Sequence, residues 1–99
     1  MWYAIMSEDV DDSLPLRAKA RPDHLARVRL LVDEGRVLVA GPHPAIDAED
    51  PGEAGFSGSL IVADFESLEE AERWAAEDPY VTARVYRNVT VKPFKVVLP

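Results

Sequence analysis

The chain opens with a short apolar run, and the polar stretch after it marks the first boundary. Residues 2–6 are apolar at every position and stop at an acidic cluster, which predicts a buried strand. Residues 7–16 are mostly polar and contain Pro15, so they predict a loop. The pattern therefore indicates one short strand followed by a long connection.

A helix is expected next, from Pro22 to about Gly35. Proline is favoured in the first helical turn, and apolar residues then recur at helical spacing, which gives one stripe for burial. The stripe consists of Leu25, Val28, Leu31 and Val32. Gly35 suits a left-handed cap and ends the helix.

Two further apolar runs, residues 36–40 and 59–65, predict strands. Residues 43–58 between them are rich in Pro, Gly, Asp and Glu and predict a long loop. A Ser-x-x-Glu capping box at Ser67 indicates the start of a second helix, with Leu68, Ala71, Trp74 and Ala75 on one face.

The second helix is expected to end near Asp78-Pro79, because the residue before a proline disfavours helical geometry. Residues 80–84 predict a short turn, and residues 86–98 predict a last strand. Pro93 within that strand indicates an edge position or a bulge. Trp2, Phe65 and Trp74 are interpreted as core residues.

The order strand–helix–strand therefore occurs twice. It predicts an α+β fold of the ferredoxin-like βαββαβ type, with a four-stranded antiparallel sheet and both helices on one face. A length of 99 residues corresponds to one domain, so residues 1–99 are expected to form a single unit.

Two helices cover only one face of such a sheet, yet the predicted strands are apolar on both faces. An uncovered second face would expose a larger apolar patch than a monomer usually tolerates. The simplest cover is a second copy, so we expect a homodimer. Alternatively, a ligand or a different protein could cover the second face of the sheet.

Composition narrows the possible partners. The net charge is −7 and the pI is about 4.7, which disfavours nucleic acids and anionic membrane surfaces. The absence of cysteine excludes disulfides, thiol nucleophiles and thiolate metal sites. The first residues lack the basic region of a secretory signal, and no apolar run is long enough to span a membrane. We therefore expect a cytoplasmic protein.

Two side chains suited to proton transfer stand at the helix ends. His24 lies in the first turn of the first helix, where the dipole favours a neutral ring suited to act as a base. Asp78 closes the second helix, and side-by-side antiparallel helices bring these two ends near each other. Each residue has a structural alternative, since His24 can simply pack and Asp-Pro is an ordinary helix stop.

Arg17 and Arg21 precede His24 by steps of four and three residues, so a continuous helix would place all three on one face. They are the basic residues that we expect to face a pocket and attract a small anion. A metal site at His24 and His43 is the weaker alternative, because the chain has no His-x-x-x-His pairing.

Several motifs follow one another along almost the whole chain. They are Arg21-Pro22-Asp23-His24-Leu25-Ala26-Arg27, Asp33-Glu34-Gly35-Arg36, Ala40-Gly41-Pro42, Asp78-Pro79-Tyr80-Val81 and Val91-Lys92-Pro93-Phe94-Lys95. Together they resemble the YciI-like family, or YCII-related domain, of the dimeric α+β barrel superfamily. The chain departs from that pattern at Pro15-Leu16 and at His43.

The resemblance implies a ferredoxin-like fold, a dimer and a site centred on a histidine and an aspartate. These roles fall on His24 and Asp78 as catalytic residues. The implied pocket neighbours are Arg17, Arg21, Ser59 and Tyr80. Members of the broader family resemble muconolactone isomerases, and some act as dehydrochlorinases on intermediates of ring-cleavage pathways.

We therefore expect an acid–base enzyme, a lyase, an isomerase or a dehydrochlorinase-like catalyst, that acts without a cofactor on a small anionic or phenolic molecule. One alternative is a non-catalytic module that binds or senses a small molecule in the same pocket. A third and weaker hypothesis is an oxygen-using monooxygenase of the related barrel type.

Overall fold

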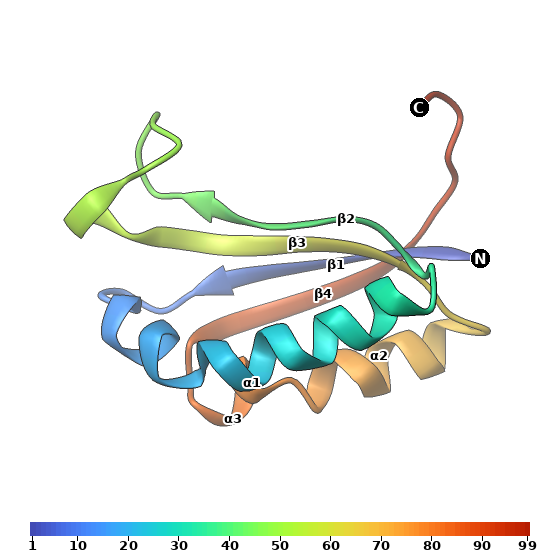
Figure 1. Ribbon diagram of the computed structural model, residues 1–99, viewed down its shortest axis with the longest axis horizontal. Helices are drawn as coiled ribbons and strands as arrows, with labels where there is room; N and C mark the ends of the chain where they lie inside the picture. The colour runs from blue at the N-terminus through green and yellow to red at the C-terminus, as the bar shows by residue number, and fades with distance from the viewer.

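The computed structural model describes residues 1–99 as an antiparallel four-stranded sheet with helices on one face (Figure 1). The strands, in the spatial order β2-β3-β1-β4, are β1 (Trp2–Asp9), β2 (Val37–Pro44), β3 (Phe56–Asp64) and β4 (Tyr86–Phe94). The helices are α1 (Leu14–Asp33), α2 (Leu68–Ala76), α3 (Pro79–Thr82) and the short η1 (Gly52–Ala54). This βαββαβ arrangement confirms the expected ferredoxin-like α+β class. None of the helices is both long and apolar enough to cross a membrane.

The first helix begins earlier than expected, at Leu14, and Pro22 lies inside it. Pro15 occupies the first helical turn, where the missing N–H of proline has no partner to lose. Because β1 also continues to Asp9, the prediction that residues 7–16 form a loop was wrong at both ends. The actual connection is a tight turn in which Asp12 adopts a φ of 54°. The helix is thus continuous from Arg17 to His24.

The loop between the second and third strands is also shorter than the predicted range of residues 43–58. Strand β2 continues through His43 to Pro44, and β3 begins at Phe56, so the connection comprises residues 45–55 and contains η1. Strand β4 ends at Phe94 and leaves residues 95–99 as an irregular tail. The edge position that Pro93 indicated is confirmed, because β4 is an outer strand of the sheet.

The apolar core lies between the sheet and the helices. Tyr3 and Ile5 of β1 and Ile61 of β3 point toward the helices, where Val28 and Leu31 pack against them. Phe65 joins this cluster as expected. Trp74 is only half-buried but packs against this cluster, whereas the half-buried Trp2 lies outside it. Ser67 caps α2 as predicted, because its Oγ accepts a hydrogen bond from the Glu70 N–H at 3.1 Å.

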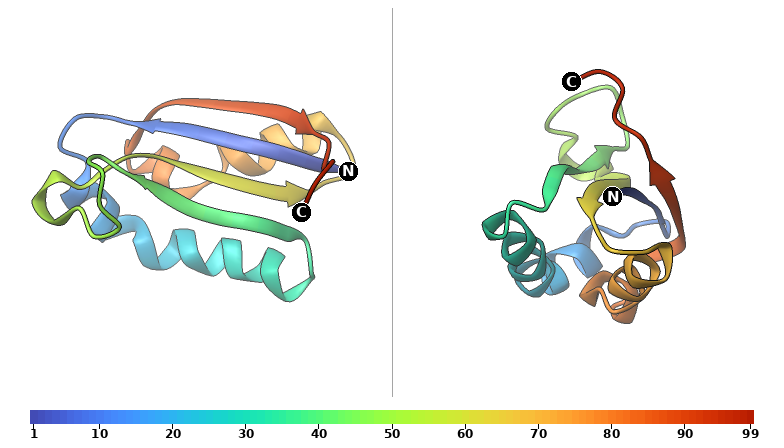
Figure 2. Two further views of the ribbon diagram at one scale, coloured as in Figure 1. Left: turned by 90° about the horizontal axis from the view of Figure 1, so that it is seen from above. Right: turned by 90° about the vertical axis from the view of Figure 1, so that its right-hand side faces the viewer.

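We call the other side of the sheet the open face, because no helix covers it (Figure 2). Alternate residues of the four strands point to it, including Trp2, Met6, Leu60, Val39 and Phe94. Val39 is 51% exposed and Phe94 is 41% exposed. Residues 45–55 and the tail 95–99 rise from this face at opposite ends of the strands (Figure 1). They form two walls around a floor that carries apolar side chains and, at one hollow, polar ones.

Candidate active site

The centre of the site is a contact between α1 and the start of α3. His24 Nδ1 lies 2.8 Å and 2.9 Å from the two carboxylate oxygens of Asp78. The side chains are 11% and 4% exposed, so the pair is buried. A carboxylate can only accept a hydrogen bond, so Nδ1 carries the proton that is donated. The other ring nitrogen, Nε2, has no hydrogen-bond partner and is not fully enclosed.

Local sequence explains why Asp78 stands where it does. The chain leaves α2 at Glu77, and Asp78 adopts extended backbone geometry before Pro79. Pro79 then opens α3, and Asp78 becomes its N-cap, with Oδ1 accepting from the Tyr80 N–H at 2.8 Å. One carboxylate therefore both caps α3 and binds the imidazole.

The ring of Tyr80 fixes the plane of the imidazole. The two rings are stacked, with centroids 4.0 Å apart and an angle of 12° between their planes. Tyr80 packs in turn edge-on against Tyr86 at 5.5 Å, and the Arg17 guanidinium lies 5.1 Å from the Tyr80 ring centre. His24 is thus held by one hydrogen-bond partner and one stacking partner, both from α3 and its cap.

A pocket of about 260 Å³ opens beside His24, between α1 and the edge strand β2. Its polar lining comes from the imidazole, two arginines, a serine and a phenol: His24, Arg17, Arg21, Ser59 and Tyr80. Its apolar wall consists of Leu25, Val28, Ala40, Pro42 and Ile61. Asp78 does not line it, because it lies behind the ring, so the expectation that both residues share one cavity was wrong in this detail.

Arg17 differs from the free anion binder that the sequence predicted. Its Nε lies 2.6 Å from Asp9 Oδ2, and its Nη2 donates to Asp9 Oδ1, to the Gly58 carbonyl and to Ser59 Oγ. Burial lowers the pKa of the Arg17 guanidinium, but the hydrogen bond and the charge of Asp9 outweigh this and raise it overall. Arg17 is therefore a charged structural residue at the pocket floor.

Arg21 is exposed at the pocket and forms no ion pair. Of the two arginines it is the one free to meet a ligand. Ser59 is buried, receives the Arg17 hydrogen bond at 2.9 Å and receives a longer one, 3.4 Å, from the Tyr86 hydroxyl. The structure thus brings all six predicted site residues together, with Asp9 and Tyr86 as additional members.

Asp9 and Arg27 were not expected at the site from the sequence. Asp9 follows Tyr3, Ile5 and Ser7 at alternate positions of β1, so a longer strand would have placed an acid on the core face. Such a buried acid requires a partner. His43, by contrast, lines a separate hollow on the open face together with Glu8, Arg87 and Lys92. Nowhere do three or more His, Asp or Glu side chains form a group that could hold a metal ion.

Both site tyrosines stay neutral well into the alkaline range. Burial raises the pKa of Tyr80, against the opposing charges of Arg17 and Arg21. Burial likewise raises the pKa of Tyr86, although hydrogen bonding to Ser59 partly offsets the rise. The phenols therefore serve as neutral hydrogen-bonding and stacking groups around His24.

Fold and site together define a class of protein, a ferredoxin-like α+β protein with a buried His–Asp pair behind a small pocket. The model of the YCII-related domain family matches residues 1–95, so the chain belongs to this family. Protein YciI of Escherichia coli O6:H1 is 60% identical over 97 residues, which cover 98% of this chain and 99% of that protein. An uncharacterized protein of Haemophilus influenzae is 54% identical over the same length and coverage.

A solved structure has the same fold. The 5-chloro-2-hydroxyhydroquinone dehydrochlorinase TftG from Burkholderia phenoliruptrix, in complex with 2,5-dihydroxybenzoquinone, matches with a TM-score of 0.83. The sequences are 24% identical, and the match covers 96% of this chain and 94% of that one. At this identity the likeness establishes the architecture alone.

The Arg17–Asp9 pair yields a stability prediction. Asp9→Asn leaves a buried guanidinium without its countercharge and should lower the free energy of unfolding by about 3–5 kcal/mol in urea titrations. The double variant Asp9→Leu with Arg17→Met removes both charges and should recover much of that loss. Glu69→Ala, which breaks the exposed Arg73–Glu69 pair, is the control and should change stability by less than about 1 kcal/mol. A double variant that is at least as unstable as Asp9→Asn would contradict this account.

The tyrosines yield a pH prediction. The unfolded phenols ionise near pH 10, whereas the raised pKa of folded Tyr80 and Tyr86 keeps them protonated to higher pH. Stability should therefore be unaffected below about pH 10 and fall above it, by at most about 1.4 kcal/mol per pH unit for each phenol. Urea unfolding at stepped alkaline pH tests this. The double variant Tyr80→Phe with Tyr86→Phe should flatten the decline, and an unchanged slope would refute the assignment.

Proposed function

We propose that this chain is a cofactor-independent enzyme that moves a proton on a small anionic or phenolic molecule, as a lyase or isomerase does. His24 is the base and then the acid, Asp78 orients it, and Arg21 attracts the negative charge of the ligand. The supporting observation is the contact of His24 Nδ1 with Asp78, which leaves Nε2 as the free nitrogen of a ring that borders the pocket.

The chemistry follows from that arrangement. With its proton on Nδ1, the imidazole presents a lone pair at Nε2, and it can abstract a proton from a carbon or hydroxyl within hydrogen-bond reach. The imidazolium that forms is stabilised by the adjacent carboxylate of Asp78. The same nitrogen then returns the proton at another atom of the ligand. This completes either an isomerisation or the loss of a leaving group, and no redox step is required.

The pocket limits the ligand. A volume of about 260 Å³ is below the range of roughly 300–1,000 Å³ that is typical of drug-sized ligands, so one substituted ring fits. Apolar Leu25, Pro42 and Ile61 suit the faces of such a ring, and Arg21 suits a carboxylate or phenolate on its rim. The dehydrochlorinase of similar fold is named for a hydroxylated chlorinated ring and was solved with a dihydroxybenzoquinone, which is the same class of compound.

We also propose that the chain works as a homodimer in which a second copy covers the open face. Part of that face is apolar, and the apolar residues of the tail are exposed, with Val97 at 77% and Leu98 at 83%. Exposed apolar side chains on a face bounded by two walls support an interaction site there. Burial of about 800 Å² on each copy is typical of a stable interface.

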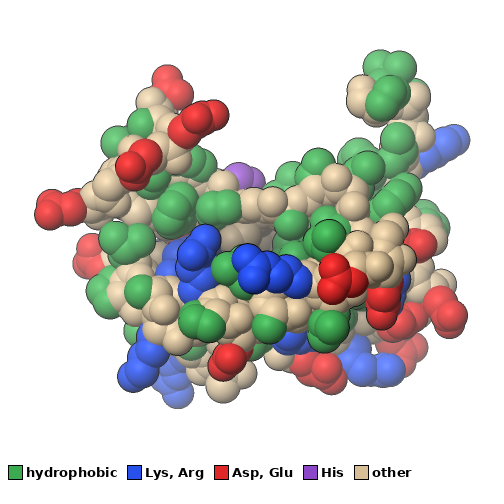
Figure 3. All heavy atoms as spheres, in the orientation of Figure 1, with side chains coloured by type: hydrophobic (Ala, Val, Ile, Leu, Met, Phe, Trp, Pro, Cys, Tyr) green, Lys and Arg blue, Asp and Glu red, His purple; other side chains and the backbone are tan.

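Charge decides how the second copy is oriented. The wall at residues 45–55 is acidic, whereas a basic side chain lies beside the tail at the other end of the strands (Figure 3). The acidic residues are Asp47, Glu49, Asp50 and Glu53, and the basic ones are Lys95 of the tail and Lys92 of the adjoining strand β4. A two-fold axis across the strands sets the acidic wall of each copy against the basic tail of the other. An axis along the strands would set acid against acid.

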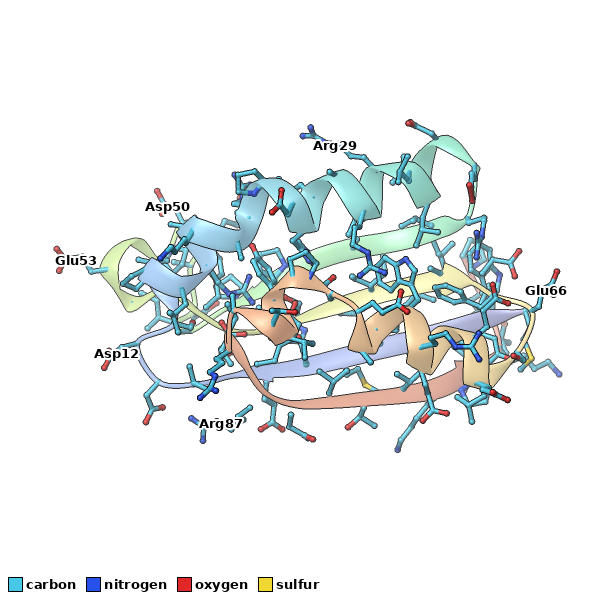
Figure 4. The ribbon with its side chains drawn as sticks, turned by 90° about the horizontal axis from the view of Figure 1, so that it is seen from below. Asp12, Arg29, Asp50, Glu53, Glu66 and Arg87 are labelled. Atoms are coloured by element: carbon cyan, nitrogen blue, oxygen red, sulfur yellow. The ribbon has the colours of Figure 1, made fainter.

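The catalytic proposal is tested on a panel of small phenolic and enolic acids in D₂O, with deuterium incorporation or product formation followed by proton NMR. His24→Ala should lower turnover by about 10²–10⁴-fold, and Asp78→Asn should lower it less, because it acts through the ring. Arg29→Gln is the control, since Arg29 points away from the fold (Figure 4). Both site variants matching wild type on a substrate that turns over would refute the proposal. Ligand binding with no turnover by wild type would instead identify a binding module.

The dimer is tested by sedimentation equilibrium at low ionic strength. Lys92→Glu with Lys95→Glu, and separately Glu49→Lys with Glu53→Lys, should each weaken association at least about tenfold, because each sets like charges across the interface. An equimolar mixture of the two variants should regain wild-type association as a heterodimer. Stronger association after removal of the acidic charges would favour the other axis, and a monomeric wild-type chain would refute the dimer.

A further inference from the structure

One buried polar side-chain atom has no hydrogen-bond partner, the Nη1 of Arg27. Arg27 lies one helical turn beyond His24 on α1, and its Nη1 is 3.6 Å from Asp78 Oδ2. This separation is too long for a hydrogen bond but is within ion-pair range. The positive charge of Arg27 therefore faces the same carboxylate that receives the imidazole.

The guanidinium is held in place by groups other than Asp78. Its Nη2 donates to the Trp74 carbonyl at 3.0 Å, and its central carbon lies 4.4 Å from the Trp74 ring centre. Both contacts anchor the group to α2 and spare Nη1. Arg27 therefore places a positive charge near Asp78 without forming a hydrogen bond to it. Both carboxylate oxygens remain available to His24 and to the Tyr80 N–H.

The charges around His24 show what this arrangement does. From α1, Arg17 and Arg21 line the pocket beside the ring and Arg27 lies against Asp78, and Arg17 is already neutralised by Asp9. From α3 the ring is faced by Asp78 and the neutral phenol of Tyr80. The parts of β2 and β3 that line the pocket contribute no charged group. Asp78 is thus the one carboxylate that faces the ring and favours the imidazolium, and Arg27 opposes it.

We propose that Arg27 is a positioning residue that supplies the countercharge for Asp78, so that His24 stays neutral with its proton on Nδ1 and its free nitrogen toward the pocket. Asp78 then orients the ring without converting it into a permanent ion pair. The inference deepens the proposed function, since only a neutral ring can begin the reaction as a base. It concerns the protonation state of the free protein, so it can fail independently of any substrate.

The test is the protonation of the His24 ring, followed by two-bond proton–nitrogen NMR correlations from about pH 5 to 9, the range in which histidine titrates. Arg27→Gln removes the charge and keeps a donor, and it should move the midpoint of the His24 titration upward by about one pH unit. Arg27→Lys keeps the charge and should stay close to wild type. His43, the second histidine, is an internal reference that should not move.

Two controls separate this role from a purely structural one. Arg29→Gln removes a positive charge from an exposed position of the same helix and should leave the His24 midpoint unchanged. Arg27→Met keeps the aliphatic stem over Trp74 and supplies the neutral comparison if the glutamine variant does not fold. A His24 midpoint that is the same in wild type and in a folded neutral variant, or one that moves equally in the lysine variant, would overturn the proposal. Neither result would affect the turnover test of His24.

Discussion

A single buried carboxylate connects the two halves of this fold. Asp78 is 4% exposed, and a charge so enclosed is tolerated only when hydrogen bonds and countercharges surround it. Its three partners come from two elements: the Tyr80 N–H of α3, and His24 and Arg27 on successive turns of α1. If Asp78 were apolar, α3 would lose its cap and the imidazole its orientation. The start of α3 and the middle of α1 are therefore held together by one side chain.

The interior is divided along the strands, and this division places the site. The core-facing residues of β1 change from Tyr3 and Ile5 to Ser7 and Asp9 within one strand. The apolar end packs against α2 and the second half of α1. The polar end meets Arg17, Ser59 and the tyrosines, whose hydrogen bonds satisfy one another. A polar end of this kind contributes less hydrophobic stability than a fully apolar core, but its hydrogen-bonding groups surround the buried His–Asp pair.

The parts of the structure that sequence predicted are those governed by local signals. Helical spacing, the capping box at Ser67 and the alternation of apolar runs were sufficient for the βαββαβ order. Pro22 misled the prediction of α1, because a proline signal was assigned to the first turn when Pro15 already occupied it. The Arg17–Asp9 pair was missed for a related reason. The first strand was predicted to end at residue 6, which placed Asp9 in a loop.

The contact between His24 and Asp78 was expected only as a consequence of antiparallel helices, and no spacing in the sequence specifies it. The geometry of this contact depends on long-range packing. Asp78 lies behind the ring because Tyr80, two residues later, stacks on the ring itself. Arg27 could not be singled out from its neighbours, since Arg27 and Arg29 look equivalent in sequence. Only the fold shows that one faces Asp78 and the other faces solvent.

The pocket and the open face share one strand, and this connects the two proposals. Along β2, Ala40 and Pro42 point to the pocket, whereas Val39 and Gly41 pair with the open-face positions Val62 and Leu60. As an edge strand, β2 is bonded to the sheet on one side only, by β3. A second copy packed on Val39 would restrain β2 from the face opposite the pocket. The pocket wall at Pro42 would then be held in place from both sides, so association and ligand binding would be coupled through alternate residues of one strand.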